Sequence, residues 1–375
     1  MAKPSIVIIG GGLAGLINAI VLSKADFEVT LIERKKYPFN RVCGEYISNE
    51  VLPFLNRLGI FPLLVGAAEI NTLKVTSVNG NTLNQKLDLG GFGISRFKLD
   101  HLLYQKALAC GTKFILETKV NEVLFKDEKF YLSLADEQPL QADLVIGSFG
   151  KRSNIDQKLN RPFFYQRSPY LGVKYHIKTQ FPNNLIQLDN FEGGYCGISK
   201  IEDDLYCLCY LTKNSQLKKY GSIPEMEKMV LHKNHHLKYV FDNSDFVWPK
   251  PETINEISFN PKSTITNHII MSGDSAGMIA PLCGNGMAMA IHSASLLSKC
   301  IIKHTALGIL PAIRATLEEE YTQLWQQNFA HRLFIGRSIQ GLFGSNRLSN
   351  NAVGVLGNLP KVSRYLISKT HGSGF

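Results

Sequence analysis

Residues 5–15 read Ser-Ile-Val-Ile-Ile-Gly-Gly-Gly-Leu-Ala-Gly, a strand-like apolar run that leads directly into spaced glycines. Gly10, Gly12 and Gly15 fit the pattern G-x-G-x-x-G. In this pattern the first glycine allows a tight turn, the second lets the backbone approach a pyrophosphate, and the third permits close packing of helix on strand. The helix expected over 13–23 would offer free N–H groups and a positive dipole to phosphates. The stretch therefore predicts a dinucleotide site.

A second strand is expected over 28–32, and it ends next to Glu33, 18 residues after Gly15. A carboxylate at this point can accept hydrogen bonds from a ribose diol and would repel a 2′-phosphate. The β-α-β order also predicts a parallel sheet with a right-handed crossover. A glycine-rich turn without a ligand is the alternative for the glycines alone, but the strand, helix and carboxylate together favour a bound dinucleotide.

A distant glycine-rich segment distinguishes a flavin from a nicotinamide dinucleotide. Residues 273–281, Gly-Asp-Ser-Ala-Gly-Met-Ile-Ala-Pro, follow an expected strand and precede an expected helix. Asp274 then sits where a carboxylate can bind the ribityl hydroxyls of a flavin. Residues 284–286, Gly-Asn-Gly, would let the backbone and a helix N-terminus approach a flat ring and stabilise negative charge on the reduced flavin. Together the two segments predict FAD.

The remaining pattern predicts the domain organisation of this α/β chain. Alternation from Leu73 with a hairpin turn at 79–80, and strands over 170–211, indicate an antiparallel sheet. A helix is expected over 96–109, two or three antiparallel strands over 112–134, and helices over the last 65 residues. We expect a Rossmann-like three-layer FAD-binding domain of residues 1–72, 96–156 and 258–305, an inserted substrate-binding β-sheet domain of residues 73–95 and 157–257, and a C-terminal helical region of residues 306–375.

The charge distribution and the cysteine content limit the cellular locations and binding partners that the sequence allows. The net charge is +10, and the segment Tyr321 to Phe375 contains no Asp or Glu but six basic residues, Arg332, Arg337, Arg347, Lys361, Arg364 and Lys369. A solvated face and an anionic membrane surface both stay open for this tail, whereas nothing resembles a nucleic-acid motif. No apolar run is long enough for a spanning helix. Seven cysteines without metal-ligand spacing predict no metal site and suit a cytoplasmic protein, soluble or peripheral at a membrane.

The sequence resembles the para-hydroxybenzoate hydroxylase-type FAD-dependent oxidoreductase superfamily, and within it the geranylgeranyl reductase-like branch, over nearly the whole chain. Besides the two glycine segments, residues 41–45, Arg-Val-Cys-Gly-Glu, are similar to the Cys-Gly segment that the reductase branch places near the flavin. The resemblance implies that Arg41 contacts the pyrophosphate and that residues 95–100 open the helix beside the adenosine. The residues expected at the cofactor are Gly10, Gly12, Leu13, Ala14, Gly15, Glu33, Arg34, Arg41, Arg96, Gly150, Gly273, Asp274, Gly277, Pro281, Gly284, Asn285 and Gly286.

Two segments depart from the family pattern. In residues 147–153, Phe149 stands where the family has an Asp that is associated with pyrophosphate binding and with nicotinamide use. Reduction by NAD(P)H therefore stays open beside reduction by an electron-carrier protein. In residues 195–200, Gly197 replaces a tryptophan and Ser199 a proline. The halogenase signature is thus lost, and the prenyl substrate stays open.

The catalytic candidates are Cys43, Glu45 and Tyr195. Cys43 and Glu45 belong to the segment near the isoalloxazine, where an apolar environment would raise the pKa of Glu45 and let it relay a proton. A helix-capping role is the alternative for Glu45, and inert packing for Cys43. Tyr195 and Cys196 are expected on the substrate side of the inserted sheet. His292 is expected to be a satisfied helix histidine rather than a base.

Three functions are compatible with these residues. The first is FAD-dependent hydride transfer to or from a small hydrophobic substrate, such as an isoprenoid or an alkyl-polyketide-like molecule. The second is monooxygenation of an aromatic substrate through C4a-hydroperoxyflavin. The third is a non-catalytic module that binds flavin or lipid, which the departures at Phe149 and Gly197 keep open.

Overall fold

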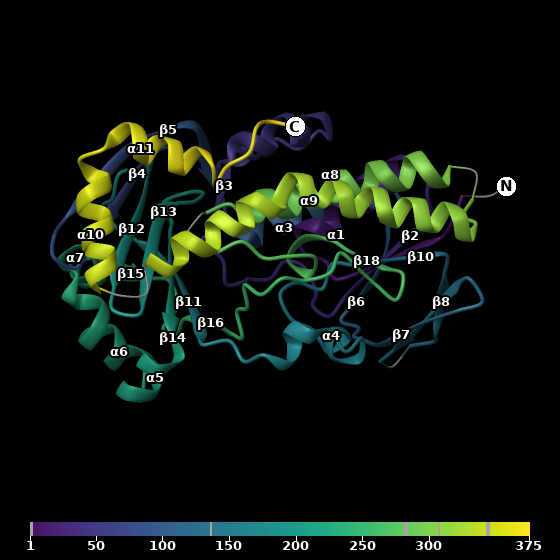
Figure 1. Cartoon of the computed structure of the whole chain (residues 1–375), viewed down its shortest axis with the longest axis horizontal. Coiled ribbons are helices and arrows are strands. Elements are labelled where there is room, and N and C mark those ends of the chain that lie inside the picture. The colour runs from purple at the N-terminus through teal and green to yellow at the C-terminus, as the bar shows by residue number, and fades with distance from the viewer. Residues whose placement is uncertain (1–2, 136, 281–283, 307, 343–345) are drawn as a thin grey trace.

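The computed structural model describes residues 3–135, 137–280, 284–306, 308–342 and 346–375. The molecule is elongated, with a parallel sheet at one end and a large, mostly antiparallel sheet at the other (Figure 1). Helix α9 (Pro311–Leu342) reaches from the first end toward the second (Figure 1). The expected α/β architecture with an antiparallel sheet and C-terminal helices is confirmed.

The parallel sheet has β1 at its centre, and all four residues of β1 are buried. A strand that is covered on both faces is apolar throughout, as the first motif predicts. Helices α1, α3 and α8 pack together on one face, and a small three-stranded sheet lies on the other side (Figure 1). The sheet order is β17 (Ile265–Thr266), β18 (Ile269–Met271), β10 (Leu144–Gly147), β1 (Ile6–Ile9), β2 (Val29–Glu33) and β6 (Lys113–Leu116); the helices are α1 (Leu13–Lys24), α3 (Arg96–Ala109) and α8 (Gly286–Thr305).

The small sheet corrects one expectation. Strand β6, over 113–116, pairs in parallel with β2 and so belongs to the parallel sheet. Only the rest of the segment expected as antiparallel, β7 (Val120–Lys126) and β8 (Lys129–Leu134), forms a hairpin, to which β9 (Leu140–Ala142) adds an antiparallel edge. The hairpin turn lies at 127–128, as the sequence indicates.

The large sheet collects strands from distant parts of the chain. Strand β12 pairs in parallel with β4, and β3 pairs with β5, so the sheet takes in residues as early as Tyr46. The division expected at residue 73 falls inside β4. The sheet order is β15 (Asp245–Phe246), β11 (Tyr170–Lys178), β14 (Tyr206–Lys213), β13 (Gly194–Lys200), β12 (Leu185–Phe191), β4 (Ala68–Thr76), β5 (Thr82–Gly93) and β3 (Tyr46–Ser48), with β16 (Glu252–Asn255) also on β11.

Helices cover the large sheet on both sides. One group is formed by the residues between β14 and β15, a segment for which the sequence pattern had predicted neither helices nor strands. The other group follows α9 and packs against β5 (Figure 1). The first group is α5 (Asn214–Tyr220), α6 (Ile223–Val230) and α7 (His235–Asp242), the second is α10 (Asn346–Gly357) and α11 (Pro360–Ser368), and the short helices α2 (Leu52–Arg57) and α4 (Asn154–Lys158) lie elsewhere.

Candidate functional site

The glycine-rich loop between β1 and α1 leaves an open space at the head of the helix. Gly10 has φ +101°, and a Cβ there would lie 2.4 Å from the carbonyl oxygen of Ser148. A Cβ on Gly15 would lie 2.0 Å from the carbonyl oxygen of Gly10. At Gly12 the nearest heavy atom is 3.8 Å away, on the guanidinium of Arg96. Two of the glycines therefore serve the turn and the packing, and Gly12 leaves room for a ligand.

Carboxylates and guanidiniums alternate beside this loop. Glu33, at the end of β2, accepts hydrogen bonds from the Gly11 amide at 2.9 Å and from Arg41 at 3.2 Å. Arg41 also donates to Asp100 at 3.1 Å, and Asp100 accepts two hydrogen bonds of 2.8 Å from Arg96. Both guanidiniums line the cavity described next. Guanidiniums of this kind could contact a pyrophosphate and a carboxylate at the end of β2 a ribose diol, which stays a prediction for Arg41, Arg96 and Glu33.

A continuous cavity of about 940 Å³ begins at the glycine loop and ends under the large sheet. Its first part is lined by the loop, by the β2 end with the exposed Arg34, and by residues 148–155. Its middle is lined by residues 41–46, by Gly273 and Asp274, and by Gly284 and Gly286. Its far part lies between the large sheet and helices α10 and α11. The volume is at the upper end of the range for ligand pockets.

The second glycine-rich segment reaches the same cavity. Gly273 has φ +67°, and a Cβ there would lie 2.8 Å from the Cβ of Ala14, so the segment packs directly on α1. The Asp274 side chain lines the cavity, and burial raises its pKa above the ordinary value. A carboxylate that has lost water gains from hydrogen bonds to ligand hydroxyls. The residues thus fit the ribityl and pyrophosphate parts of FAD.

Of the residues expected at the cofactor, two make packing contacts away from the cavity wall and a third lies outside the described residues. A Cβ on Gly277 would come within 2.7 Å of the Trp325 ring, so this glycine allows α9 to pack closely. The buried Asn285 donates a hydrogen bond of 2.9 Å to the carbonyl of Thr370 and so holds the C-terminal segment. Over the described residues, the wall of the cavity includes neither. Pro281 lies outside the described residues.

Two lysines that the sequence reading missed lie near Asp274. Lys151, in the cavity wall, has a buried Nζ that finds no hydrogen-bond partner among the described residues, and burial lowers its pKa to about 8. Lys262 donates hydrogen bonds of 2.7 Å to the carbonyls of Lys151 and Asp274. Gly150 supports this turn with φ +83° and an amide that donates to Ser275 at 3.0 Å. An unpaired buried ammonium fits a phosphate ligand. For Lys151 the sequence did contain a signal, because Lys151 and Arg152 form a basic pair directly after Gly150.

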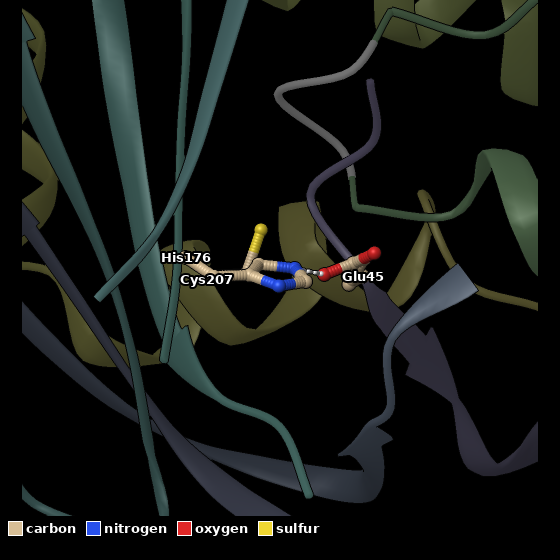
Figure 2. A group of neighbouring side chains, drawn as sticks. All are labelled: Glu45, His176 and Cys207. Atoms are coloured by element: carbon tan, nitrogen blue, oxygen red, sulfur yellow. Dashed lines mark hydrogen bonds and ion pairs between the residues drawn. The ribbon is translucent and has the colours of Figure 1, made fainter. Parts of the chain in front are cut away.

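Glu45 is the centre of a buried ionic cluster. Its Oε1 accepts from Lys174 Nζ at 2.5 Å and from the Arg96 amide at 2.8 Å, and its Oε2 lies 2.6 Å from His176 Nε2. Figure 2 shows the His176 ring facing Glu45, with Cys207 beside it. Burial alone would raise the pKa of Glu45, but Lys174 and His176 outweigh it and hold the pKa below its ordinary value. The expected raised pKa is therefore wrong, because the carboxylate is paired.

The same cluster has donor atoms of metal-binding type. One donor atom from each of Glu45, His176 and Cys207 lies within 4.8 Å of the others (Figure 2). Lys174, however, already neutralises Glu45 and carries a positive charge that would repel a dication. Burial also raises the pKa of Cys207 well above its ordinary value, which keeps the thiol neutral. The cluster is better suited to hold the 41–45 loop than to bind a metal.

The other two catalytic candidates both reach the cavity. Cys43 lines it from the 41–45 loop, and Tyr195 lines it from β13 of the large sheet. Burial raises the pKa of Cys43, so its thiol stays protonated and is a weak nucleophile. Cys196, next to Tyr195 on β13, is fully buried in the core on the opposite face. The expectation that Cys196 lines the substrate side is therefore wrong, because neighbouring side chains alternate along a strand.

His292 packs in the core of the helical layer. Its ring stacks on Phe375 with centroids 3.9 Å apart and meets Phe329 edge-on at 5.2 Å. Burial lowers the pKa of His292 to about 4, helped by the positive charges of Arg332 and Lys299. It does not line the described cavity, which agrees with a structural role.

Replacing His292 with Phe is expected to make the protein less sensitive to acid. The unfolded imidazole keeps a pKa near 6.5 while the folded one has a pKa of about 4, so protonation favours unfolding. Stability is then full above pH 6.5 and falls as the pH drops toward 4, by up to about 3 kcal/mol. Urea unfolding across this pH range measures the slope. His331→Phe, an exposed site on α9, serves as control, and equal slopes in wild type and H292F would contradict the assignment.

The fold and the site define an FAD-dependent oxidoreductase. Residues 3–306 match the model of the family described as FAD binding domain, and the chain belongs to this family. It is 20% identical over 362 residues to the digeranylgeranylglycerophospholipid reductase of Methanosarcina mazei, covering 91% of this chain and 85% of the relative.

Solved structures share the fold over almost the full length. A geranylgeranyl bacteriochlorophyll reductase-like protein from Thermoplasma acidophilum has a TM-score of 0.79 at 14% identity, covering 99% of this chain and 96% of that chain. The flavin-dependent brominase Bmp2 has a TM-score of 0.80 at 16% identity, covering 98% and 93%. The resemblance to the geranylgeranyl reductase-like branch is confirmed, and halogenases share the same architecture.

Proposed function

We propose that the protein transfers hydride between FAD and a hydrophobic substrate that carries an isoprenoid or alkyl chain. The observation that carries this proposal is the far part of the cavity, which we call the chamber. Its walls are apolar side chains from both sheet and helices, among them Leu73, Val75, Ile186, Leu188, Val353 and Leu356. Burial of an apolar chain in such a space contributes about 0.8 kcal/mol per CH₂ group.

The chain's residues divide the work along the cavity. The glycine loop, Lys151 and Asp274 would hold the dinucleotide, and FAD supplies the hydride chemistry when bound. The Lys174–Glu45 ion pair holds the 41–45 loop against strand β11. The apolar chamber orients the isoprenoid or alkyl chain of the substrate and excludes water from its reacting carbon.

Two protic groups line the cavity, one on the 41–45 loop and one on the large sheet. Cys43 keeps its proton because burial raises its pKa, and Tyr195 contributes a phenol to the same wall. We assign the delivery of a proton to the reacting carbon to one of this pair. Glu45 positions the loop instead, because its carboxylate is ionised and paired.

Two further observations support a chain-like substrate. The name of the Methanosarcina mazei relative specifies a geranylgeranyl lipid. Among the described residues, a Cβ on Gly197 would meet Leu188 at 3.3 Å and the backbone oxygen of Cys209 at 3.7 Å, and Gly197 lines the cavity, so the missing tryptophan leaves space for a ligand. Halogenation finds no support in this segment, since both signature residues are replaced.

The purified protein is expected to be yellow and to be reduced by dithionite or by a carrier protein faster than by NADH or NADPH. Phe149 in the cavity wall motivates the donor part, because it stands where the family places a carboxylate. The reduced protein, kept anaerobic, should be reoxidised by a polyprenyl compound and not by a phenol. Rapid NADPH oxidation with oxygen uptake, stimulated by a phenol, would instead establish an aromatic monooxygenase.

Gly197→Phe provides the matched variant for this experiment. The new ring would fill the chamber near Leu188 without touching the dinucleotide end. We expect an unchanged flavin spectrum and unchanged dithionite reduction, with reoxidation by the polyprenyl compound slowed by about tenfold or more. Equal reoxidation rates in G197F and wild type would exclude the chamber as the substrate site.

A further inference from the structure

Helices α10 and α11 have an inner face that closes the chamber. Val353 and Leu356 of α10 and Leu366 and Ile367 of α11 line the cavity. Gly357 lies so close to β5 that a Cβ there would come within 2.6 Å of the carbonyl oxygen of Thr82. We call the two helices the cap. The cap is one helix layer thick, so its outer face lies opposite the chamber (Figure 1).

The outer face of the cap exposes large apolar side chains. On α10, Leu348 and Val355 are exposed about two turns apart, and on α11, Val362 and Tyr365 are exposed about one turn apart. Val355 is 58% exposed and Tyr365 60% exposed. Single exposed apolar residues are ordinary, whereas a group on one short helical pair marks an interaction surface. The group consists of Leu348, Val355, Leu359, Val362 and Tyr365.

Basic side chains lie on or directly after the same two helices, and Lys369 Nζ lies 5.0 Å from the centroid of the Tyr365 ring. Arg347, Lys361 and Lys369 are exposed on the cap, and Arg364 is held by an ion pair with Asp88. No acidic residue occurs from Tyr321 to the end of the chain. The other tail arginines are placed on α9, and Arg332 is turned inward to Glu50 at 3.4 Å. Three of the six basic residues of the tail thus lie exposed on or directly after the helices that carry the apolar group.

We propose that the outer face of the cap docks on an anionic membrane surface. Apolar side chains can enter the boundary between headgroups and acyl chains while the surrounding basic residues contact anionic headgroups. Among the described residues, no helix has both the length and the apolarity to cross a bilayer. The contact is therefore peripheral, and it combines the two signals, apolar and electrostatic, that stable surface binding needs.

Docking would place the chamber within one helix layer of the bilayer. If the proposed function holds, a lipid-borne chain can pass from the acyl region into the chamber without crossing bulk water. Polar tethers between cap and sheet include the exposed Arg364–Asp88 pair and a part-buried bond of 3.0 Å from Asn81 to the carbonyl of Asn350. Docking itself depends only on the outer face, so it can be tested without turnover.

The test compares two triple variants of the FAD-loaded protein in vesicle flotation. Arg347→Gln, Lys361→Gln and Lys369→Gln together remove the free charges of the cap. Lys218→Gln, Lys219→Gln and Lys228→Gln remove the same number of exposed charges from α5 and α6, on the opposite side of the large sheet (Figure 1). The vesicles are phosphatidylcholine, alone or with about one-third phosphatidylglycerol, at low and high salt.

Wild type and the α5–α6 variant should float with the phosphatidylglycerol vesicles and not with pure phosphatidylcholine. The cap variant should bind these vesicles at least about tenfold more weakly than wild type, since each basic residue adds to binding at an anionic surface. Val355→Ser with Tyr365→Ser should also weaken binding but retain its dependence on salt. Absence of vesicle binding by wild type, or equal loss in both triple variants, would overturn the proposal. Unchanged thermal unfolding and flavin content show that the variants fold.

Discussion

Gly12→Val is expected to abolish FAD binding while the apo-protein stays folded. The backbone at residue 12 has φ −83° and ψ −174°, a conformation that valine adopts readily, and the nearest heavy atom to a Cβ is 3.8 Å away. The Cβ thus fits without backbone strain among the described residues. Its methyl groups would instead fill the space at the head of α1 that a pyrophosphate requires. We expect the dissociation constant for FAD to rise about 100-fold or more.

Fluorescence titration of apo-protein with FAD measures this effect, and thermal unfolding of the apo-protein checks the fold. Gly341→Val is the control, because Gly341 is exposed on α9 and also has open space around its Cβ position. Wild-type affinity in G12V would show that the glycine loop does not hold the pyrophosphate. Loss of affinity in both variants would show that the effect is not specific to the loop.

Lys174→Met is expected to destabilise the protein by about 3–5 kcal/mol, because it leaves the ionised Glu45 buried without its strongest partner. The Lys174 and Glu45 side chains are fully buried, so water cannot replace the lost ammonium. Lys174 also donates to the carbonyl of Arg41 at 3.1 Å, so the loop at the flavin end loses a second tie. Urea unfolding at neutral pH measures the loss.

The double variant Lys174→Met, Glu45→Gln should recover part of this stability, since it removes the uncompensated charge. Lys178→Met is the matched control, because Lys178 lies on the same strand, β11, but is exposed. If K174M and K178M cost the same free energy, the buried pair does not stabilise the fold. A double variant less stable than K174M would mean that Glu45 is held by its other partners.

Local features of the fold could be predicted from the sequence because local residues determine them. The three spaced glycines predicted the β-α-β turn, since the positive φ of Gly10 and the Gly15 contact are backbone requirements. Helix α3 begins where expected because Ser95 caps it, its hydroxyl accepting from the Lys98 amide at 3.1 Å. Within the strands expected over 170–211, the alternation of Leu171, Val173, Tyr175 and Ile177 predicts that these side chains share one face, and all four lie in one core cluster.

Contacts between distant segments account for what the sequence could not show. On the second face of β11, Lys174 and His176 look like outward polar residues, and nothing in their alternation indicates that the 41–45 loop covers them. Their partner Glu45 is 129 and 131 residues away. Its expected place beside the isoalloxazine suggested a raised pKa, and the ionic partners that lower the pKa are supplied by the tertiary fold. Strand β6 was misassigned for the same reason, since its partner β2 is remote.

The parallel pairing of β4 with β12 has a consequence for how the chain acquires its structure. These strands are more than 100 residues apart, with Leu73 opposite Ile186, and part of the dinucleotide domain lies between them in the chain. During synthesis, the early hairpin of β4 and β5 emerges long before its neighbour in the sheet. Until β12 is synthesised, the edge of β4 stays unpaired and can form hydrogen bonds with other, non-native strands. High contact order of this kind slows folding. Because the dinucleotide domain and the large sheet are interleaved along the chain, we expect them to fold and unfold together.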